Sequence, residues 1–361
     1  MKRIIIFITL ILSFSFSSFA SSSENKSEPF DPGKMIMEHI GDAHSWHILT
    51  YKDKDVAIPL PVILINEGKV DIFMSSKFEH GHASYKGYRL ANVERDGEKA
   101  KGKIICVDSN GKWTGKMPFD LSITKNVLML LIVSLIIIVV VFRAKSIAKK
   151  RVGKSPKGAQ TIVEFIILFI RDDIAIPSIG LKRYQKFMPY LLTAFCFIFL
   201  SNIMGLIPFF PGGANLTGNI AVTLVLAVFT FIITNFSANK AYFKHIFNMP
   251  GVPWWLKFPL PIMPVVEILS LFTKPFALTI RLFANITAGH IIILGFLSII
   301  FIFGSQNVAL GYGVSIVPVF FAIFMSLLEI LVAFIQAYVF TLLSAIYIGM
   351  ANEEHAEVEH H

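Results

Sequence analysis

The sequence predicts an all-α membrane protein with five membrane-crossing helices, one interfacial amphipathic helix and a small N-terminal domain outside the cytoplasm. Only 16% of the 361 residues are charged and 54% are hydrophobic, whereas globular chains carry about 25% charged residues. The apolar residues gather in blocks of about 18 or more, which is long enough to cross a bilayer core. Basic residues follow these blocks, as they do in cytoplasmic loops of membrane proteins.

The net charge of +9 is concentrated beside the membrane. The densest basic run, residues 143–157, directly follows an apolar block. Nucleic-acid binding would need basic residues interleaved with aromatic ones on a soluble module. The placement therefore excludes nucleic acid and indicates the lipid bilayer as the partner. Cys106 lies in a polar segment and Cys196 in an apolar block, so we expect neither a disulfide nor a cysteine metal site.

The first 20 residues have the pattern of a cleavable signal peptide. A basic start precedes a short apolar stretch, and Ser18 and Ala20 supply the small residues before a cleavage site. The alternative is a short first membrane span. Cleavage after Ala20 would leave the mature N-terminus outside the cytoplasm.

Residues 21–122 are polar and mixed in charge, and we expect them to form an extracytoplasmic domain. Short alternating stretches such as 62–65 and 103–107 are separated by Gly, Asn and Asp, which indicates a strand-rich or loosely ordered domain. Its histidines suggest a metal site, but no helical His-Glu pair or cysteine accompanies them, so none is predicted. These histidines are His39, His44, His47, His80 and His82.

Residues 123–350 form the predicted membrane domain, and residues 351–361 form a polar tail in the cytoplasm. The segment 158–178 mixes apolar and charged residues and reads as an amphipathic helix on the cytoplasmic interface. The uncharged turn 208–218 belongs outside, because the basic loops belong inside. The predicted spans are 123–142, 186–208, 217–238, 258–303 and 314–350.

The last two apolar stretches are unusually long. At 1.5 Å per residue, the first could reach roughly 69 Å, which is too long to stand upright in a bilayer. It must be strongly tilted or broken. An uncharged link, residues 304–313, joins the two stretches. We expect an antiparallel hairpin that turns near residue 308 or 309.

Polar residues inside these two stretches are the candidate functional residues, because a charge at the bilayer centre costs about 2.5 to 3.5 kcal/mol. A spacing of seven places Glu267, Lys274 and Arg281 on one helix face, and Asn285 lies one turn beyond Arg281. Small residues beside Arg281 would let another helix approach closely and slide past. They are Ala277, Ala284 and Ala288.

The hairpin register predicts which polar groups meet. Arg281 falls at the depth of Gln336, and His290 comes within about one helical turn of Glu329. This pair lies roughly 10 to 14 Å from Arg281 on the outer side, and Glu267 lies about 21 Å away on the inner side. An imidazole beside a carboxylate can relay protons. The alternative is that these polar groups only hold the helices together.

At these residues the chain resembles subunit a of the F-type ATP synthase. The matching segments are 267–285, 336–344, 202–208 and 350–355, and the resemblance covers about 123–355. It implies a stator subunit in a bacterial inner membrane that couples the proton gradient to ATP synthesis. It also implies no cofactor and no catalytic site on this chain. The expected partners are the ring of c subunits, the peripheral-stalk b subunits and, indirectly, the catalytic head.

The resemblance implies a role for each candidate residue. Arg281 matches the family's essential arginine, between two offset half-channels at the interface with the rotating ring. His290, Glu329, Asn285 and Gln336 match outer half-channel positions, and Glu267 matches an inner one. Some family members carry Glu where His290 stands and His where Glu329 stands. This exchange keeps one acid and one imidazole in a facing pair.

Two other classes of protein bury charges in a membrane. A secondary proton-coupled transporter usually shows internal repeats with paired broken helices, and the halves of this chain show no such correspondence. A structural anchor for a peripheral complex would not need an arginine among alanines with an acid and an imidazole nearby. The extra N-terminal domain is absent from the minimal pattern of the subunit a family.

Overall fold

The computed structural model describes residues 31–51, 54–81, 83–91, 96–97, 100, 102–108, 110–151, 155–207, 210–247 and 262–352. The predicted signal peptide and the tail from residue 353 onward lie outside these residues. The chain divides into two compact units. The first comprises Met1–Ile132, Met204–Asn215 and Ser298–Ser315, and the second comprises Val133–Ile203, Leu216–Leu297 and Ile316–His361.

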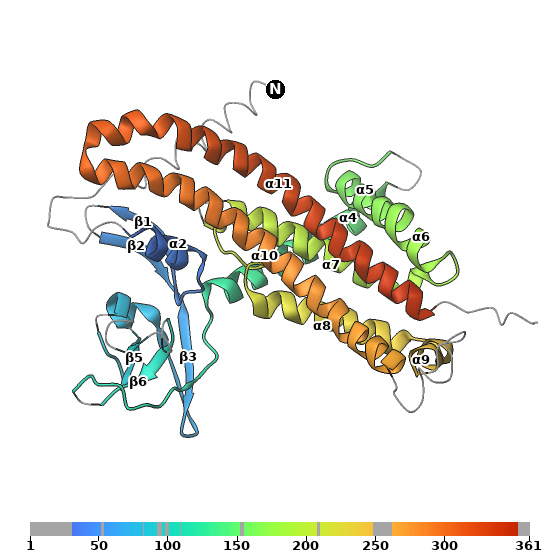
Figure 1. Cartoon of the computed structure of the whole chain (residues 1–361), viewed down its shortest axis with the longest axis horizontal. Helices are drawn as coiled ribbons and strands as arrows, with labels where there is room; N and C mark the ends of the chain where they lie inside the picture. Colours follow the sequence, from blue (N-terminus) through green and yellow to red (C-terminus); the bar gives the residue numbers. More distant parts are fainter. Residues whose placement is uncertain are drawn as a thin grey trace, which may run out of the picture. The chain divides into compact units, whose positions relative to one another are not determined.

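The N-terminal part of the first unit is rich in strands (Figure 1). Of the two expectations, a strand-rich domain and a loosely ordered one, the first is confirmed. One short helix, α2 (Pro32–Ile40), precedes three small antiparallel sheets, with strand orders β1–β2, β4–β3–β7 and β5–β6. The strands are β1 (Ser45–Tyr51), β2 (Lys54–Pro59), β3 (Pro61–Asn66), β4 (Lys69–Met74), β5 (Tyr88–Leu90), β6 (Ile104–Cys106) and β7 (Phe119–Asp120), and a 3-10 helix spans Ser75–Gly81.

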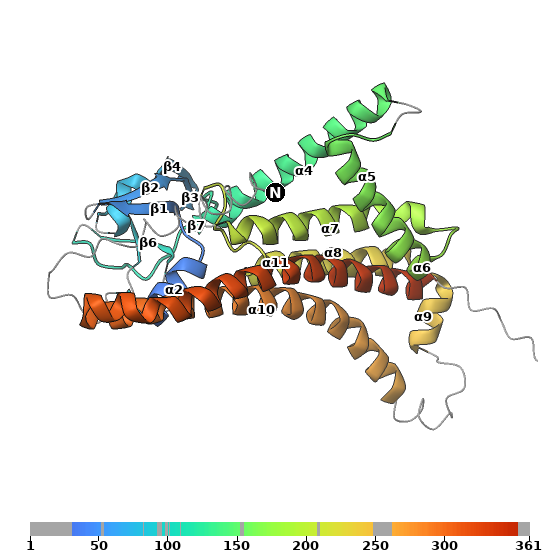
Figure 2. The same ribbon diagram turned by 90° about the horizontal axis from the view of Figure 1, so that it is seen from above.

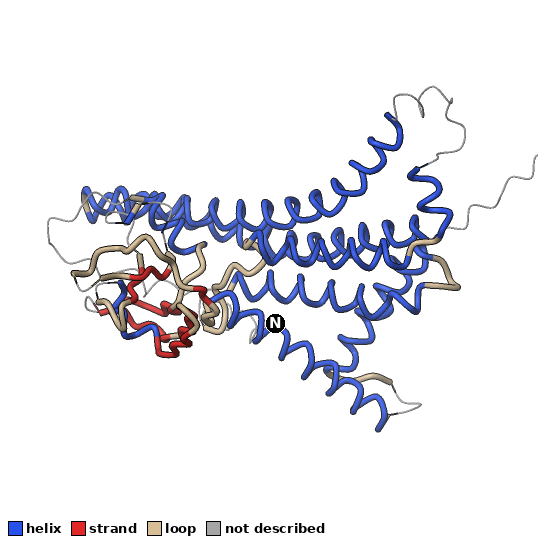
Figure 3. Tube along the Cα trace, turned by 90° about the horizontal axis from the view of Figure 1, so that it is seen from below, coloured by secondary structure: helices blue, strands red, loops and turns tan. Residues whose placement is uncertain are grey.

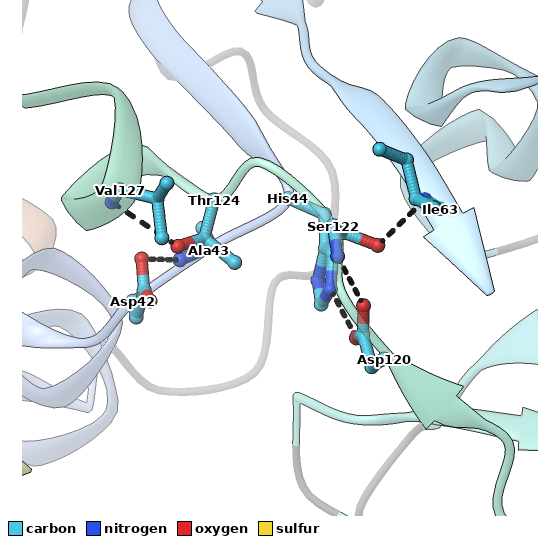
Figure 4. Close-up of polar contacts among 8 residues, drawn as sticks. All are labelled: Asp42, Ala43, His44, Ile63, Asp120, Ser122, Thr124 and Val127. Atoms are coloured by element: carbon cyan, nitrogen blue, oxygen red, sulfur yellow. Dashed lines mark hydrogen bonds and ion pairs between the residues drawn. The ribbon is translucent and has the colours of Figure 1, made fainter. Parts of the chain in front are cut away.

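Helix α4 (Lys125–Lys150) begins directly against this domain. The Lys125 amide donates to the Ala43 carbonyl at 2.8 Å. The Asn126 amide donates to the Asp42 carboxylate at 3.1 Å. A carboxylate here satisfies an amide that the first helical turn cannot pair internally and complements the helix dipole. Figure 4 shows Asp42 and Ala43 beside the start of α4.

Among the described residues, five helices are long and apolar enough to cross a membrane, as predicted. Backbone groups in a bilayer must be paired within the segment, and this explains why each apolar block is helical. Figure 3 shows that helices make up most of the chain and that the strands lie in its N-terminal part. The five are α4, α7 (Tyr184–Leu206), α8 (Ile220–Ser237), α10 (Ile262–Gln306) and α11 (Val308–Asn352).

The predicted amphipathic segment is helical. It comprises α5 (Ala159–Phe169), a π-helical turn (Ile170–Ala175) and α6 (Ile176–Ile179). Ile170 and Ile174 are fully buried and pack in one cluster with residues of α7, α10 and α11. A further short helix, α9 (Lys240–Phe247), follows α8. Within the second unit, α7, α8, α10 and α11 lie side by side in Figures 1 and 2.

The hairpin of α10 and α11 turns more tightly than the sequence predicted. The expected link, residues 304–313, is mostly helical, and Asn307 alone separates the two helices. The Asn307 side chain accepts a hydrogen bond from the Ala309 amide at 2.9 Å and so caps α11. Gly304 and Gly311 meet across the turn, where a β-carbon on Gly311 would lie 2.7 Å from the Gly304 Cα.

Each hairpin helix has 45 residues, or about 68 Å of helix, more than twice a bilayer core. Pro275 lies inside α10 and Pro318 inside α11. Figure 2 shows α10 curving toward its N-terminal end. Proline removes a backbone hydrogen bond and bends a helix. Each helix is therefore one continuous element within the described residues, and α10 is curved.

Candidate functional site

His290 and Glu329 face each other across the α10–α11 hairpin. Nδ1 of His290 lies 3.4 Å from Oε1 of Glu329, and the two side chains are only 12% and 9% exposed. The pairing was predicted from the register, and the structure confirms that the residues meet. The second Glu329 oxygen, Oε2, is buried and has no hydrogen-bond partner among the described residues. This acid–imidazole pair can therefore share one proton away from bulk water.

Gly289 makes room for the Glu329 carboxylate. A β-carbon built at Gly289 would contact Oε1 of Glu329 directly. Glu329 thus lies level with residue 289, one position from the predicted level at residue 288. Eight residues farther from the turn on each helix, position 289 is replaced by Arg281 and position 329 by Ala337. Arg281 is therefore level with Ala337, the neighbour of Gln336. The predicted depth of Arg281 is therefore correct to about one residue.

Other contacts follow the same antiparallel register in the second unit. The rings of Phe296 and Phe321 stack with centroids 5.4 Å apart. Nζ of Lys274 lies 5.4 Å from the centroid of the Tyr347 ring. The hairpin is thus paired on both sides of the His290–Glu329 contact, and this fixes the depth of every polar group on it.

Arg281 lies on an exposed stripe of α10. Leu278, Leu282 and Ile286, which point into the bundle, are 2%, 1% and 8% exposed. Within the described part of the chain, Arg281 makes no hydrogen bond or ion pair. A guanidinium on the outside of a membrane helix is costly unless a partner covers it. The residues of this stripe, all exposed, are Ala277, Arg281, Ala284, Asn285 and Ala288.

Asn285, Gln336 and Glu267 are not brought into direct contact with the His290–Glu329 pair. Asn285 is exposed on the Arg281 stripe, whereas Gln336 is buried at 7% exposure. Neither makes a side-chain hydrogen bond within the described residues. Glu267 is half-buried near the start of α10. The structure therefore gathers one close pair and leaves the other three candidates at separate depths.

A pocket opens near Lys274, on the side of Arg281 away from the His290–Glu329 pair. Burial raises the pKa of Tyr242 in α9, and the Glu267 carboxylate raises it further. Thr234 Oγ1 is buried without a partner among the described residues. The pocket is lined by Ala227, Thr230, Phe231, Thr234, Asn235, Tyr242, Leu271, Lys274, Pro275, Leu278 and Tyr347.

A family model described as ATP synthase A chain matches residues 127–349. The chain belongs to this family. Relatives named ATP synthase subunit a confirm the membership. One from Chlorobaculum tepidum, named subunit a 2, is 50% identical over 242 residues, 65% of this chain and 64% of the relative. One from Chloroherpeton thalassium is 45% identical over 250 residues, 67% of this chain and 71% of the relative.

The chain spans just under two thirds of the Chlorobaculum relative's length. A further relative, from Chlorobium phaeobacteroides strain BS1, is 45% identical over 283 residues, 72% of this chain and 79% of the relative. The N-terminal residues 35–121 match a separate family model, described as a domain of unknown function, DUF8433. The chain is thus a multi-pass membrane protein of this family. Its N-terminal segment lies outside the residues that the ATP synthase A chain model matches and matches a family model of its own.

The A-chain bundle contains a polar network that sequence reasoning missed. Tyr190 on α7 lies 2.6 Å from the Thr230 hydroxyl on α8, which lies 3.2 Å from the Ser344 hydroxyl on α11. A second buried contact joins α7 to the segment before α8, where the Thr217 hydroxyl donates a hydrogen bond to Oδ1 of Asn202 at 2.6 Å. The available signal was the presence of hydroxyl groups inside apolar spans, but no spacing showed that they meet.

Proposed function

We propose that the chain is the stator subunit a of an F-type ATP synthase and conducts protons through two offset half-channels. The half-channels meet at an interface with a rotating ring of c subunits, each carrying a membrane carboxylate. The observation that carries this proposal is the exposed Arg281, unpaired within the described residues and flanked by alanines. A partner with a mobile carboxylate would neutralise this charge, and the small side chains would let the partner slide past.

Arg281 acts on each arriving carboxylate. Its positive charge attracts the carboxylate and favours the deprotonated form. The proton therefore leaves into one half-channel before the carboxylate passes Arg281, and a new proton enters from the other. The fixed charge also repels protons and so blocks a direct leak between the half-channels. The membrane potential contributes about 2.3 kcal/mol per charge per 100 mV.

The outer half-channel uses the His290–Glu329 pair, with Asn285 and Gln336 between that pair and the ring. The pair takes a proton from water and passes it toward Arg281. Support comes from its burial and from the 3.4 Å approach of Nδ1 and Oε1. One ring nitrogen of a neutral imidazole can accept a proton while the other donates one, so His290 can pass the proton on.

The inner half-channel uses the pocket beside Lys274 and the Glu267 carboxylate. Thr230, Thr234 and Tyr242 are among the residues that line this pocket. A proton released by the ring would leave on this side, toward Glu267. The Coulombic influence of Glu267 on Lys274 and Tyr242 supports a charged path here.

Five crossings place the N-terminal domain, the α7–α8 loop and the α10–α11 turn on one side of the membrane. In agreement, the rings of Trp46 and Phe210 meet edge to face with centroids 5.3 Å apart. The basic segment after α4 lies on the opposite side, which is the cytoplasm by the positive-inside rule. The chain thus belongs in the bacterial inner membrane. The b subunits and the catalytic head complete the machine, because this chain supplies no catalytic site.

Cross-linking in the whole ATP synthase tests the rotor interface. Cysteines at positions 277 and 288 would each be combined with a cysteine beside the c-subunit carboxylate. A matched control places cysteine at Leu135 on α4, which is 60% exposed. We expect a–c cross-links from 277 and 288 and none from 135. Absence of cross-links from both stripe positions in an assembled complex would contradict the proposed interface.

A further inference from the structure

The β4–β3–β7 sheet of the N-terminal domain has two unlike faces. One face packs against the domain core, where Val62, Leu64 and Phe73 are 0%, 0% and 9% exposed. Successive residues of a strand point to opposite faces, so their neighbours form the other face. That face is also apolar but is exposed. Its exposed members are Val70 at 59%, Ile72 at 64%, Met74 at 42%, Phe119 at 65% and Leu121 at 53%.

The strand register joins these side chains into one patch. Ile65 pairs with Val70 on one side and with Phe119 on the other. Ile63 pairs with Ile72, and its carbonyl accepts a hydrogen bond from the Leu121 amide. Large contiguous apolar patches on a protein surface mark interaction sites. We name the set Pro61, Ile63, Ile65, Val70, Ile72, Met74, Phe119 and Leu121 the apolar sheet face.

The apolar sheet face is continuous with the start of the first membrane span. The Ile123 amide donates to the Pro61 carbonyl at 3.0 Å, and α4 begins two residues later. The first turns of α4 also expose apolar side chains, with Val127 at 41% and Leu131 at 50%.

The connection between sheet and helix is short and held by hydrogen bonds (Figure 4). The Ile63 amide donates to the Ser122 hydroxyl at 3.1 Å. The Ser122 amide donates to Asp120 at 2.8 Å, and Asp120 lies 2.9 Å from the ring nitrogen of His44. These contacts hold the sheet in a fixed orientation to the first turn of α4. The sheet that bears the apolar sheet face is therefore fixed relative to the first turn of α4, where the first membrane span begins.

We propose that the apolar sheet face rests on the outer leaflet of the membrane, with its side chains at the boundary between head groups and acyl chains. Lipid is the occupant because the sheet is hydrogen-bonded to the segment that leads directly into α4, a candidate membrane span whose exposed residues are apolar. Apolar side chains placed at this depth bind the interface through the hydrophobic effect. The inference rests on the membrane orientation given under the proposed function and is independent of proton conduction.

Spin labels test this contact in the whole ATP synthase reconstituted in lipid nanodiscs. With Cys106→Ala and Cys196→Ala as background, labels replace Ile72 or Phe119 on the face. Matched control labels replace Lys103 or Lys112, which are exposed on the β5–β6 side. Oxygen concentrates in lipid, whereas a nickel chelate stays in water. We expect labels at 72 and 119 to collide mainly with oxygen, and labels at 103 and 112 mainly with the nickel chelate.

Each other outcome overturns the proposal. Labels at 72 and 119 that collide with the nickel chelate as often as the controls do would show that the face is open to water. Labels shielded from both reagents would show that protein covers the face, either another subunit or a second copy of this chain. Because all four positions are exposed, the labels replace no core contact. The result is read from accessibility alone, so loss of proton transport would not affect it.

Discussion

Gly289 lies opposite Glu329 so closely that a β-carbon at position 289 would contact the carboxylate oxygen Oε1. The same oxygen is the one that approaches His290. A residue without a side chain therefore sets the position of the acid in the acid–imidazole pair. Glycine is used here for close approach, not for an unusual backbone conformation.

Gly289→Ala should displace the Glu329 carboxylate from His290 and slow proton transfer. Positioned proton-transfer groups contribute factors of 100 or more, so we expect gradient-driven ATP synthesis to fall by about tenfold or more. Gly295→Ala is the matched control, because its β-carbon would meet nothing within 4 Å. Both complexes should assemble normally. Equal activity of the two variants would show that the position of Glu329 does not matter.

Exchange of His290 and Glu329 tests whether the two side chains share one proton site. We expect His290→Glu and Glu329→His each to reduce ATP-driven proton pumping strongly. The double variant should recover a large part of the pumping, because the facing acid and imidazole are restored. Residues in contact are expected to show such non-additivity. Additive losses in the double variant would indicate that the two residues act separately.

Gly349 is a second close approach, between α11 and α6. A β-carbon at Gly349 would contact the carbonyl oxygen of Ser178 directly. Overpacking of this kind costs about 1 to 3 kcal/mol. Gly349→Ala should therefore lower the thermal unfolding midpoint of the detergent-solubilised complex by several degrees. Gly313→Ala, whose β-carbon would meet nothing within 4 Å, should leave it unchanged. An unchanged midpoint in both would contradict the close packing.

Asp120 should make the stability of the N-terminal domain depend on pH. Burial raises the pKa of Asp120, but hydrogen bonds from His44 and Ser122 outweigh burial and hold it below its usual value. A lowered folded-state pKa stabilises the domain above the unfolded-state pKa, and this stabilisation is lost as pH falls through the folded-state pKa. Asp120→Asn should therefore lower the free energy of opening of the N-terminal domain by roughly 1 kcal/mol at pH 7. In acid, the difference between this variant and the parent chain should be smaller.

The buried Cys106 thiol reports this opening. Burial raises the pKa of this thiol, so a disulfide reagent active in acid, 4,4′-dithiodipyridine, is the suitable probe. With Cys196→Ala as background, the labelling rate of the whole chain would be measured from pH 3 to pH 7. Glu79→Gln, at an exposed carboxylate, is the control. A rate for Asp120→Asn that matches the control at every pH would rule out the proposed contribution.

The membrane spans and the His290–Glu329 contact could be predicted because both follow from chain geometry. Each apolar block is long enough to cross a bilayer, and its backbone must be helical there. One antiparallel register then fixes which depths coincide. The tight turn was missed because glycines in a polar stretch indicate a loop. Here the Asn307 cap and the Gly304–Gly311 approach let both helices continue.

Other features depend on information that periodicity does not hold. The Tyr190–Thr230–Ser344 network requires a particular rotation of α7 and α8 toward α11, and nearly uniform apolar helices do not reveal their rotation. In β3, Val62, Ile63, Leu64 and Ile65 are all apolar, so the sequence hides the difference between a buried and an exposed face. The expected roles of Arg281, His290, Glu329, Asn285, Gln336 and Glu267 stay predictions.

Replacement of Arg281 by Ala tests the central proposal most directly. Proteoliposomes containing the whole ATP synthase would be given an imposed proton gradient, and ATP synthesis would be compared between Arg281→Ala and the control Ala284→Ser. The proposal predicts that Arg281→Ala abolishes synthesis, because no charge then separates the half-channels. The complex should still contain its c-ring and hydrolyse ATP. Gradient-driven synthesis at the control rate in an assembled Arg281→Ala complex would contradict it.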